Sequence, residues 1–331
     1  MLHCFYGLVC LSALLAFATF AGAQTDCPVQ LNPERVVVRH GGSVTADCST
    51  SVQHQGIGWE ASQGAVSMIT DKSLITWRVS ELTEWDIEPF CFINYKKGDK
   101  LHQCLVKLPV TVYKTPDSVS ISTVNHSGPM MEGKEYKLQC DVLGVAPVQY
   151  LTVKWYKGQT LLNQTTFNDN IKTPVNKTAT LLIRPDRADD GAQYKCVAEL
   201  VLGAEGPSPT ESAFNAEVYY KPKYSISTET IFKGDDVLLN CTVKANPAPT
   251  YIWDHLKETS SSSVLQSSEL SPGNYTCTAT NTRGGDSKVF IIKSNDQTTF
   301  WAIILSGVAV IVVLIISYLI FKFNSSPNSI I

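Results

Sequence analysis

The cysteines are the residues whose type and spacing point most directly to chemistry. The chain has 331 residues and ten cysteines, and once Cys4 and Cys10 of the apolar N-terminal segment are set aside, eight remain. An even set without a C-x-x-C pair disfavours a zinc site and, outside the cell, is typical of disulfides. We expect three bridges between cysteines that follow one another: Cys48–Cys91, Cys140–Cys196 and Cys241–Cys277.

A single carboxylate is the second candidate for chemistry. Gly56 to Ser62 reads as a strand that carries Trp59, and side chains alternate between the two faces of a strand. If Trp59 points into a core, Glu60 points outward at the strand end. Such a carboxylate could bind a Mg²⁺ ion held by another protein, because Mg²⁺ prefers oxygen ligands and rarely obtains all of them from one protein. The alternative is an ordinary surface glutamate.

Other carboxylates lie in the loop that precedes the second cysteine of the first pair. Glu84, Asp86 and Glu88 are equally exposed candidates by sequence, and we expect them simply to solvate this loop.

Motifs for catalysis and for nucleic-acid binding are absent from the sequence. The six histidines are scattered, and there is no G-x-S-x-G, no H-E-x-x-H and no phosphate-binding glycine loop. The net charge of -3 provides no basic surface for nucleic acid. We therefore expect a recognition protein rather than an enzyme, without a nucleic-acid partner or a cofactor of its own.

The elements that must position these residues are β-strands. Each cysteine pair has a tryptophan after its first member, which is the pattern of an immunoglobulin sandwich: Trp59, Trp155 and Trp253. Tyr194 and Tyr275 stand two residues before a second cysteine, as in a tyrosine corner, whereas the first unit has Pro89 there. The fold class is all-β: three tandem immunoglobulin-like β-sandwiches followed by one transmembrane α-helix.

The domain boundaries follow from apolar strands that end in a proline. Tyr113–Pro116 and Tyr219–Pro222 are such places, and they divide the extracellular part into three domains: 24–113, 114–220 and 221–294. Cys27 and Cys104 flank the first domain, on strands that neighbour each other in this fold. We expect a bridge between them, with an intermolecular bridge or free thiols as alternatives.

The two ends of the chain predict its compartment. Residues 1–23 end in Ala21-Gly22-Ala23, typical of a cleaved signal peptide, with an uncleaved anchor as the alternative. After a stalk at 295–299, residues 300–321 carry no charge and are long enough to span a bilayer as a helix. A tail at 322–331 follows, which disfavours a lipid-anchor signal. We expect a plasma-membrane protein of type I, with its N-terminus outside the cell.

Glycosylation sequons are unevenly distributed along the chain. The second and third domains carry all of the extracellular ones, at Asn125, Asn163, Asn176, Asn240 and Asn274. A glycan shields the surface that carries it, so the first domain is the expected place for a protein partner. The alternative is a chance distribution.

The first two domains resemble the intercellular adhesion molecules. Gly41-Gly42-Ser43-Val44, Cys48-Ser49-Thr50-Ser51 and Glu88-Pro89-Phe90-Cys91 match motifs of that family, and Thr115-Pro116-Asp117-Ser118-Val119 continues the likeness. The third domain looks like a generic immunoglobulin module. The resemblance implies that Glu60, within Gly58-Trp59-Glu60-Ala61, coordinates the Mg²⁺ of a leukocyte integrin on an opposing cell. The type of residue at this place favours a leukocyte integrin, because family members that bind other integrins tend to have Asp.

Two departures from the family pattern matter. The family has a second bridge where this chain has Val52 and Tyr95, and we expect side-chain packing, with a Cys27–Cys104 bridge, to take its place. The segment before Glu60 is also one residue shorter than in the family, which shifts that carboxylate slightly.

Two other functions stay open. One is homophilic adhesion, or metal-independent binding to another immunoglobulin-type receptor, through an open sheet face around Trp59, Phe92 and Tyr95; a homodimer is left open with it. The other is an inert spacer or a surface used for virus entry. A chelator separates integrin binding from homophilic or other metal-independent binding, because only an integrin contact needs the ion.

Overall fold

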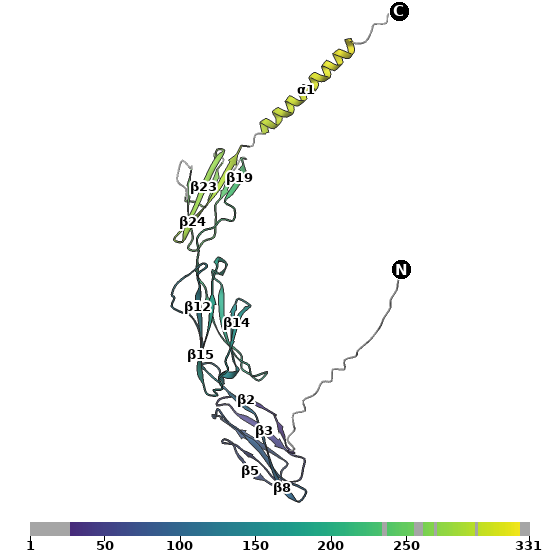
Figure 1. Cartoon of the computed structure of the whole chain (residues 1–331), viewed down its shortest axis with the longest axis vertical. Coiled ribbons are helices and arrows are strands. Elements are labelled where there is room, and N and C mark those ends of the chain that lie inside the picture. The colour runs from purple at the N-terminus through teal and green to yellow at the C-terminus, as the bar shows by residue number, and fades with distance from the viewer. Residues whose placement is uncertain (1–26, 234–236, 255–260, 268–269, 295–296, 325–331) are drawn as a thin grey trace, which may run out of the picture.

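The computed structural model describes residues 27–233, 237–254, 261–267, 270–294 and 297–324. The predicted signal peptide lies outside the described residues. Figure 1 shows three β-sandwiches arranged end to end in a gently curved rod, with the first sandwich at one end and a single helix beyond the third.

The first sandwich packs a three-stranded sheet, β1-β3-β6, against a four-stranded sheet, β5-β4-β7-β8, and a parallel pair, β2-β9, closes its side. The strands are β1 (Gln30–Asn32), β2 (Val36–Arg39), β3 (Val44–Ser49), β4 (His54–Glu60), β5 (Val66–Ile69), β6 (Leu74–Val79), β7 (Phe90–Lys97), β8 (Lys100–Lys107) and β9 (Val110–Tyr113).

The second sandwich repeats this plan with sheets β10-β12-β15 and β14-β13-β16-β17 and the parallel pair β11-β18. Its elements are β10 (Ser118–Thr123), β11 (Met130–Met131), β12 (Tyr136–Val145), η1 (Val148–Tyr150), β13 (Leu151–Lys157), β14 (Thr160–Thr166), β15 (Val175–Ile183), η2 (Arg187–Asp189), β16 (Gln193–Leu200), β17 (Thr210–Asn215) and β18 (Val218–Tyr219).

The third sandwich is the smallest, with sheets β20-β22 and β19-β24-β23-β21, of which β19 and β24 run parallel. Its strands are β19 (Thr228–Phe232), β20 (Val237–Asn240), β21 (Thr250–Asp254), β22 (Val264–Ser267), β23 (Gly273–Asn281) and β24 (Gly284–Lys293).

A tryptophan and a disulfide form the centre of each core. Trp59, Trp155 and Trp253 are buried, and each lies directly across from the second cysteine of its own sandwich. The sequence pattern therefore predicts the three sandwiches correctly. The structure joins Cys48 to Cys91, Cys140 to Cys196, Cys241 to Cys277 and Cys27 to Cys104.

The turns into the β7, β16 and β23 strands differ as their sequences do. In the third sandwich the Tyr275 hydroxyl donates to the Ser271 carbonyl at 3.0 Å, which is the geometry of a tyrosine corner. Tyr194 is buried at the same position of the second sandwich. In the first sandwich this turn is packed instead by two buried aliphatic side chains, Leu82 and Ile87.

Both junctions between sandwiches are held by a pair of backbone hydrogen bonds. Lys114, just after β9, exchanges two backbone hydrogen bonds with Ala146 (2.9 and 3.1 Å). Tyr220, just after β18, does the same with Asn246 (2.8 and 3.3 Å). Each linker is thereby bonded to the next sandwich, which favours a stiff rod over a flexible string.

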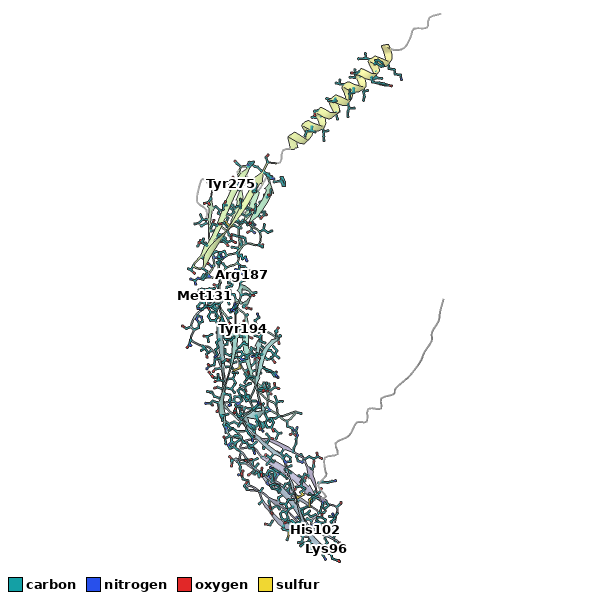
Figure 2. All side chains as sticks on the ribbon, in the orientation of Figure 1. Lys96, His102, Met131, Arg187, Tyr194 and Tyr275 are labelled. Atoms are coloured by element: carbon teal, nitrogen blue, oxygen red, sulfur yellow. A yellow bond between two sulfur atoms is a disulfide. The ribbon has the colours of Figure 1, made fainter. Side chains whose placement is uncertain are left out.

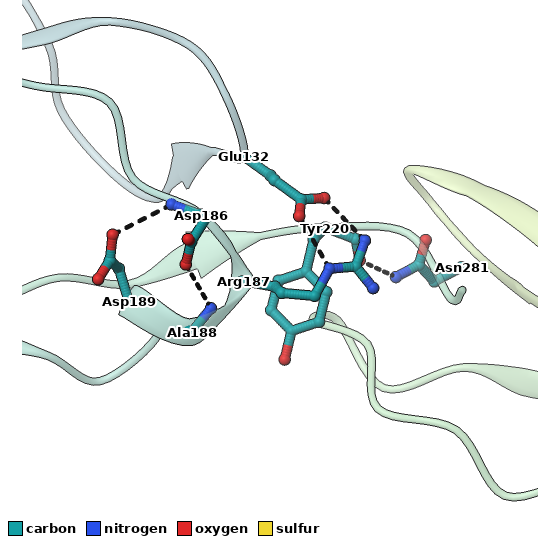
Figure 3. Close-up of polar contacts among 7 residues, drawn as sticks. All are labelled: Glu132, Asp186, Arg187, Ala188, Asp189, Tyr220 and Asn281. Carbon is teal, nitrogen blue, oxygen red and sulfur yellow. Dashed lines mark hydrogen bonds and ion pairs between the residues drawn. The ribbon is translucent and has the colours of Figure 1, made fainter. Parts of the chain in front are cut away.

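Side chains reinforce the second junction (Figure 3). Arg187 donates to both carboxylate oxygens of Glu132 at 2.8 and 3.0 Å and lies 5.1 Å from the centre of the Tyr220 ring. These hydrogen bonds lower the pKa of Glu132. From the third sandwich, the Asn281 amide donates to the Tyr220 carbonyl at 2.9 Å.

The C-terminal helix α1 extends from Gln297 to Asn324 and contains an apolar segment, Ile303–Lys322, with a mean hydropathy of 3.0. The helix is longer at both ends than the span of 300–321 expected from sequence. It takes in part of the predicted stalk because Gln297, Thr298 and Thr299 include no helix-breaking residue.

Candidate functional site

The outer face of the β5-β4-β7-β8 sheet carries the candidate site. Ile57 and Trp59 are buried on the core side of β4, so the alternation of the strand directs Gly56, Gly58 and Glu60 to the outer face. The orientation expected for Glu60 from its neighbour Trp59 is the one that the strand adopts.

Glu60 is the last residue of β4, where it lies across from Phe90 of β7. Its side chain is exposed and, within the described part of the chain, makes no hydrogen bond or ion pair. Lys107 of β8, one strand further across, is paired with Glu88. The nearest cation of this row is therefore engaged elsewhere, and the Glu60 carboxylate keeps its oxygens available.

The carboxylates of the loop before β7 have partners, so the expectation that they only solvate this loop is wrong. Glu84 is half-buried and accepts a hydrogen bond from the Ser62 hydroxyl. Asp86 pairs with Lys172 of the second sandwich, and Glu88 pairs with Lys107. Sequence alone does not find these partners because they lie on distant segments of the chain.

Two glycines on β4 allow apolar side chains to lie across the outer face. A Cβ atom at Gly58 would overlap the Phe92 ring and stand 3.0 Å from the Val66 carbonyl oxygen, and one at Gly56 would overlap Met68. Met68 and Leu105 flank Phe92 and are 50% and 45% exposed. The result is an apolar surface beside Glu60, formed mainly by Met68 and Leu105, with Phe92 only 8% exposed between them; we call these three residues the apolar strip.

The prediction of an open face around Trp59, Phe92 and Tyr95 is therefore wrong for Trp59 and Tyr95. Trp59 is only 1% exposed and belongs to the core, because its strand parity turns it inward. Tyr95 has the inward parity of its strand as well. Met68 was missed because β5 gives no clear alternation, although the two glycines of β4 are a signal that a neighbouring side chain covers them.

The second bridge of the resembling family has no packed replacement at Val52, whose side chain is 37% exposed. The expectation of packing in its place is therefore wrong at that residue. The Cys27–Cys104 bridge instead fastens the start of the described chain to β8, with its Cα atoms 5.8 Å apart.

Within the described residues, no group of three or more His, Cys, Asp or Glu side chains is placed to hold a metal ion. Glu60 offers a single carboxylate. Mg²⁺ requires six oxygen ligands, so one carboxylate can complete a coordination shell but cannot form one.

All five predicted sequon asparagines are exposed: Asn125, Asn163, Asn176, Asn240 and Asn274. The Asn176 side-chain oxygen accepts a hydrogen bond from the Gly144 backbone at 2.9 Å. Exposure is a requirement for attachment of a glycan, and the modification itself stays a prediction.

The equivalent sheet of the second sandwich has a different outer face. Lys154 of β13 pairs with Glu199 at 2.5 Å, and Lys195 pairs with Glu211 at 3.4 Å across β16 and β17. The hydrogen bond that Lys154 donates to Glu199 raises the pKa of Lys154. The charges of this face neutralise one another within the sheet.

Three family models match the chain. They describe the N-terminal domain of the intercellular adhesion molecules over residues 24–118, an immunoglobulin I-set domain over 119–207 and an immunoglobulin domain over 221–294. The first match contains the whole candidate site.

Individual proteins are similar to this chain as well. Intercellular adhesion molecule 1 of Pan troglodytes is 32% identical over 205 residues, which are 60% of this chain and 34% of that protein. Cell adhesion molecule 2 of Xenopus tropicalis is 25% identical over 318 residues, which are 87% of this chain and 71% of that protein. The chain thus spans about a third of the length of the first of these relatives.

Among solved structures, the ectodomain of mouse nectin-like molecule 4 superposes with a TM-score of 0.51 at 20% identity. The match covers 79% of this chain and 98% of that one. At this identity the likeness is one of fold.

Proposed function

This chain is an immunoglobulin-superfamily protein of the intercellular adhesion molecule family, and from that premise we propose that its first sandwich presents Glu60 to a leukocyte integrin on an opposing cell. The family is one of adhesion molecules rather than enzymes. The observation that carries the proposal is the exposed Glu60 carboxylate at the end of β4, without a hydrogen bond or ion pair to any described residue.

The proposed contact is a metal bridge. The integrin holds Mg²⁺ with its own oxygen ligands and water, and a Glu60 oxygen takes one coordination position. The apolar strip lies beside this position, where it would exclude water once the partner docks. Lower water content strengthens the attraction between the carboxylate and the ion. The sequons outside the first sandwich leave this face unshielded.

We further propose that α1 anchors the chain in the plasma membrane as a single-pass protein of type I. The apolar segment Ile303–Lys322 supports this arrangement by its length and hydropathy. It leaves the rod outside the cell, with the first sandwich farthest from the helix (Figure 1).

The test is leukocyte adhesion to cells that display the full chain. We expect adhesion in Mg²⁺, its loss in EDTA and a reduction of at least about tenfold for Glu60→Gln, because removing one partner of a buried charged contact costs about 2–5 kcal/mol. Glu81→Gln is the matched control, since Glu81 is an exposed glutamate of the same sandwich. Flow cytometry verifies equal display of each variant.

Two results would contradict the proposal. Adhesion that persists in EDTA would exclude a metal bridge. Adhesion that requires the ion but is unchanged in Glu60→Gln would agree with an integrin as the partner and would show that Glu60 does not bind its metal ion.

A further inference from the structure

The candidate face carries a second charge without a partner, at its opposite end. Lys96 of β7 shares the outward parity of Phe92, is exposed, and forms no hydrogen bond or ion pair with any residue that the structure describes. Figure 2 places Lys96 at the free end of the first sandwich, far from the second. Glu60 lies across from Phe90, so the two charges are about 20 Å apart along the strands, at about 3.4 Å per residue.

The surface between the two charges is largely apolar. The apolar strip crosses β5, β7 and β8, and Leu101, which lies across from Lys96, is 59% exposed. Only Asn94 and Gln103 interrupt this surface on β7 and β8. The outer face therefore has a negative end, an apolar centre and a positive end.

We propose that this face also binds the same face of a second copy of the chain, with the strands antiparallel. A two-fold axis across the strands, between Phe92 and Asn94, turns the Glu60 end of one copy onto the Lys96 end of the other. The remaining offset is about one strand spacing, ~4.8 Å, which a lysine side chain can reach. Each dimer then contains the Glu60–Lys96 pair twice, as an isologous interface requires.

Charge complementarity identifies a second copy as the occupant. A partner whose surface carried one sign of charge would match only one end of the face and leave the other charge buried and unpaired, which is costly. The face matches itself at both ends, and no sequon of the chain falls in the first sandwich.

The expected affinity is low. Four strands about 4.8 Å apart and about 20 Å long form a smaller contact than the ~800 Å² per partner of a stable interface. Binding of this kind becomes effective when many copies face each other on two membranes. The antiparallel arrangement suits that setting, because the two rods then extend in opposite directions.

Self-binding would also cover Glu60. The pairing itself does not depend on an integrin, whereas the following consequence rests on the proposed function: copies paired across a contact cannot offer Glu60 to a metal ion until they separate. Homophilic and integrin contacts would then exclude each other.

The test is aggregation of liposomes that carry the full chain, followed by light scattering in EDTA. We expect wild-type liposomes to aggregate and Glu60→Lys or Lys96→Glu liposomes to aggregate at least about tenfold more slowly, because each variant opposes like charges twice. A mixture of the two variants should recover wild-type rates, since each mixed dimer then has two oppositely charged pairs, one with the wild-type sign and one with the sign reversed. Misfolding of a variant cannot produce this recovery.

Matched variants complete the test. Lys100 lies on the same hairpin as Lys96, but the alternation of its strand assigns it to the opposite face, so Lys100→Glu liposomes should aggregate normally. Leu105→Asp liposomes should not aggregate. Failure of wild-type liposomes to aggregate, or a mixture no faster than its components, would overturn the proposal. Leukocyte adhesion in Mg²⁺ is measured separately: Lys96→Glu should retain it, so loss of self-binding and loss of integrin binding are distinguishable.

Discussion

The first and second sandwiches present the same sheet to solvent with opposite surface chemistry. Both pack a tryptophan beside a disulfide, and the residue before that tryptophan faces outward in each. In the first it is Gly58, which leaves room for Phe92; in the second it is Lys154, which pairs with Glu199. The fold is the same, and the outer face is free to differ.

This difference indicates which sandwich recognises a partner. The charges of the second face are paired within the sheet, and its β14 strand carries the sequon at Asn163. The first face has an apolar strip and two charges, Glu60 and Lys96, without partners among the described residues. A surface whose charges pair with one another suits a spacer, whereas a surface with unpaired charges suits binding.

The largest effect is expected from removal of the core disulfide, which both sandwiches have. Cys48→Ala and Cys140→Ala should each destabilise their own sandwich by about 2–5 kcal/mol, because the bridge constrains the unfolded chain. We expect low surface display of both variants by flow cytometry. Val52→Ala, at an exposed aliphatic position, is the control and should be displayed normally. Normal display of both cysteine variants would mean that the bridges contribute little.

An intermediate effect is expected from exchanging the residues that distinguish the faces. Gly58→Lys should cost about 1–3 kcal/mol, because its Cβ overlaps Phe92 and the nearby Val66 carbonyl limits relaxation. Lys154→Gly should cost about 0.5–1 kcal/mol from backbone entropy, with less than about 1 kcal/mol added by loss of the pair with Glu199. Hydrogen exchange of the β4 and β13 amides measures both.

A second substitution tests the reason for the Gly58 effect. In the double variant Gly58→Ala/Phe92→Ala, the β4 amide hydrogens should exchange more slowly than the sum of the two single effects predicts. The smaller side chain at position 92 removes the overlap. Additive effects would show that Phe92 is not the obstacle.

The smallest effect is expected on the second face. Glu199→Gln should lower the pKa of Lys154 toward its ordinary value and cost less than about 1 kcal/mol, since the pair is partly exposed. A raised lysine pKa stabilises the fold fully below the unfolded pKa of 10.5, and this contribution is lost as the pH rises through the folded pKa. The variant and the wild type should therefore converge in stability at high pH. NMR titration of the Lys154 side chain checks the shift.

The sequence predicts the sandwiches and the direction of Glu60 because both follow from local rules. Cysteine and tryptophan spacing defines each core, and the parity of Trp59 turns its neighbour outward. The apolar strip requires more, because Met68, Phe92 and Leu105 come from three strands whose register the sequence does not state. The partners of Glu84, Asp86 and Glu88 were missed for the same reason. The early start of α1 reflects residues that permit a helix without indicating one.

The parallel pairing of β19 with β24 has a mechanical consequence. An adhesion contact at the first sandwich would pull the rod away from the helix, so force would enter β19 at its N-terminal end and leave β24 at its C-terminal end. These strands run side by side over five residues, Thr228–Phe232 against Val289–Lys293. Their hydrogen bonds would be loaded together in shear rather than opened one after another. The smallest sandwich, next to the helix, is in this way suited to bear tension.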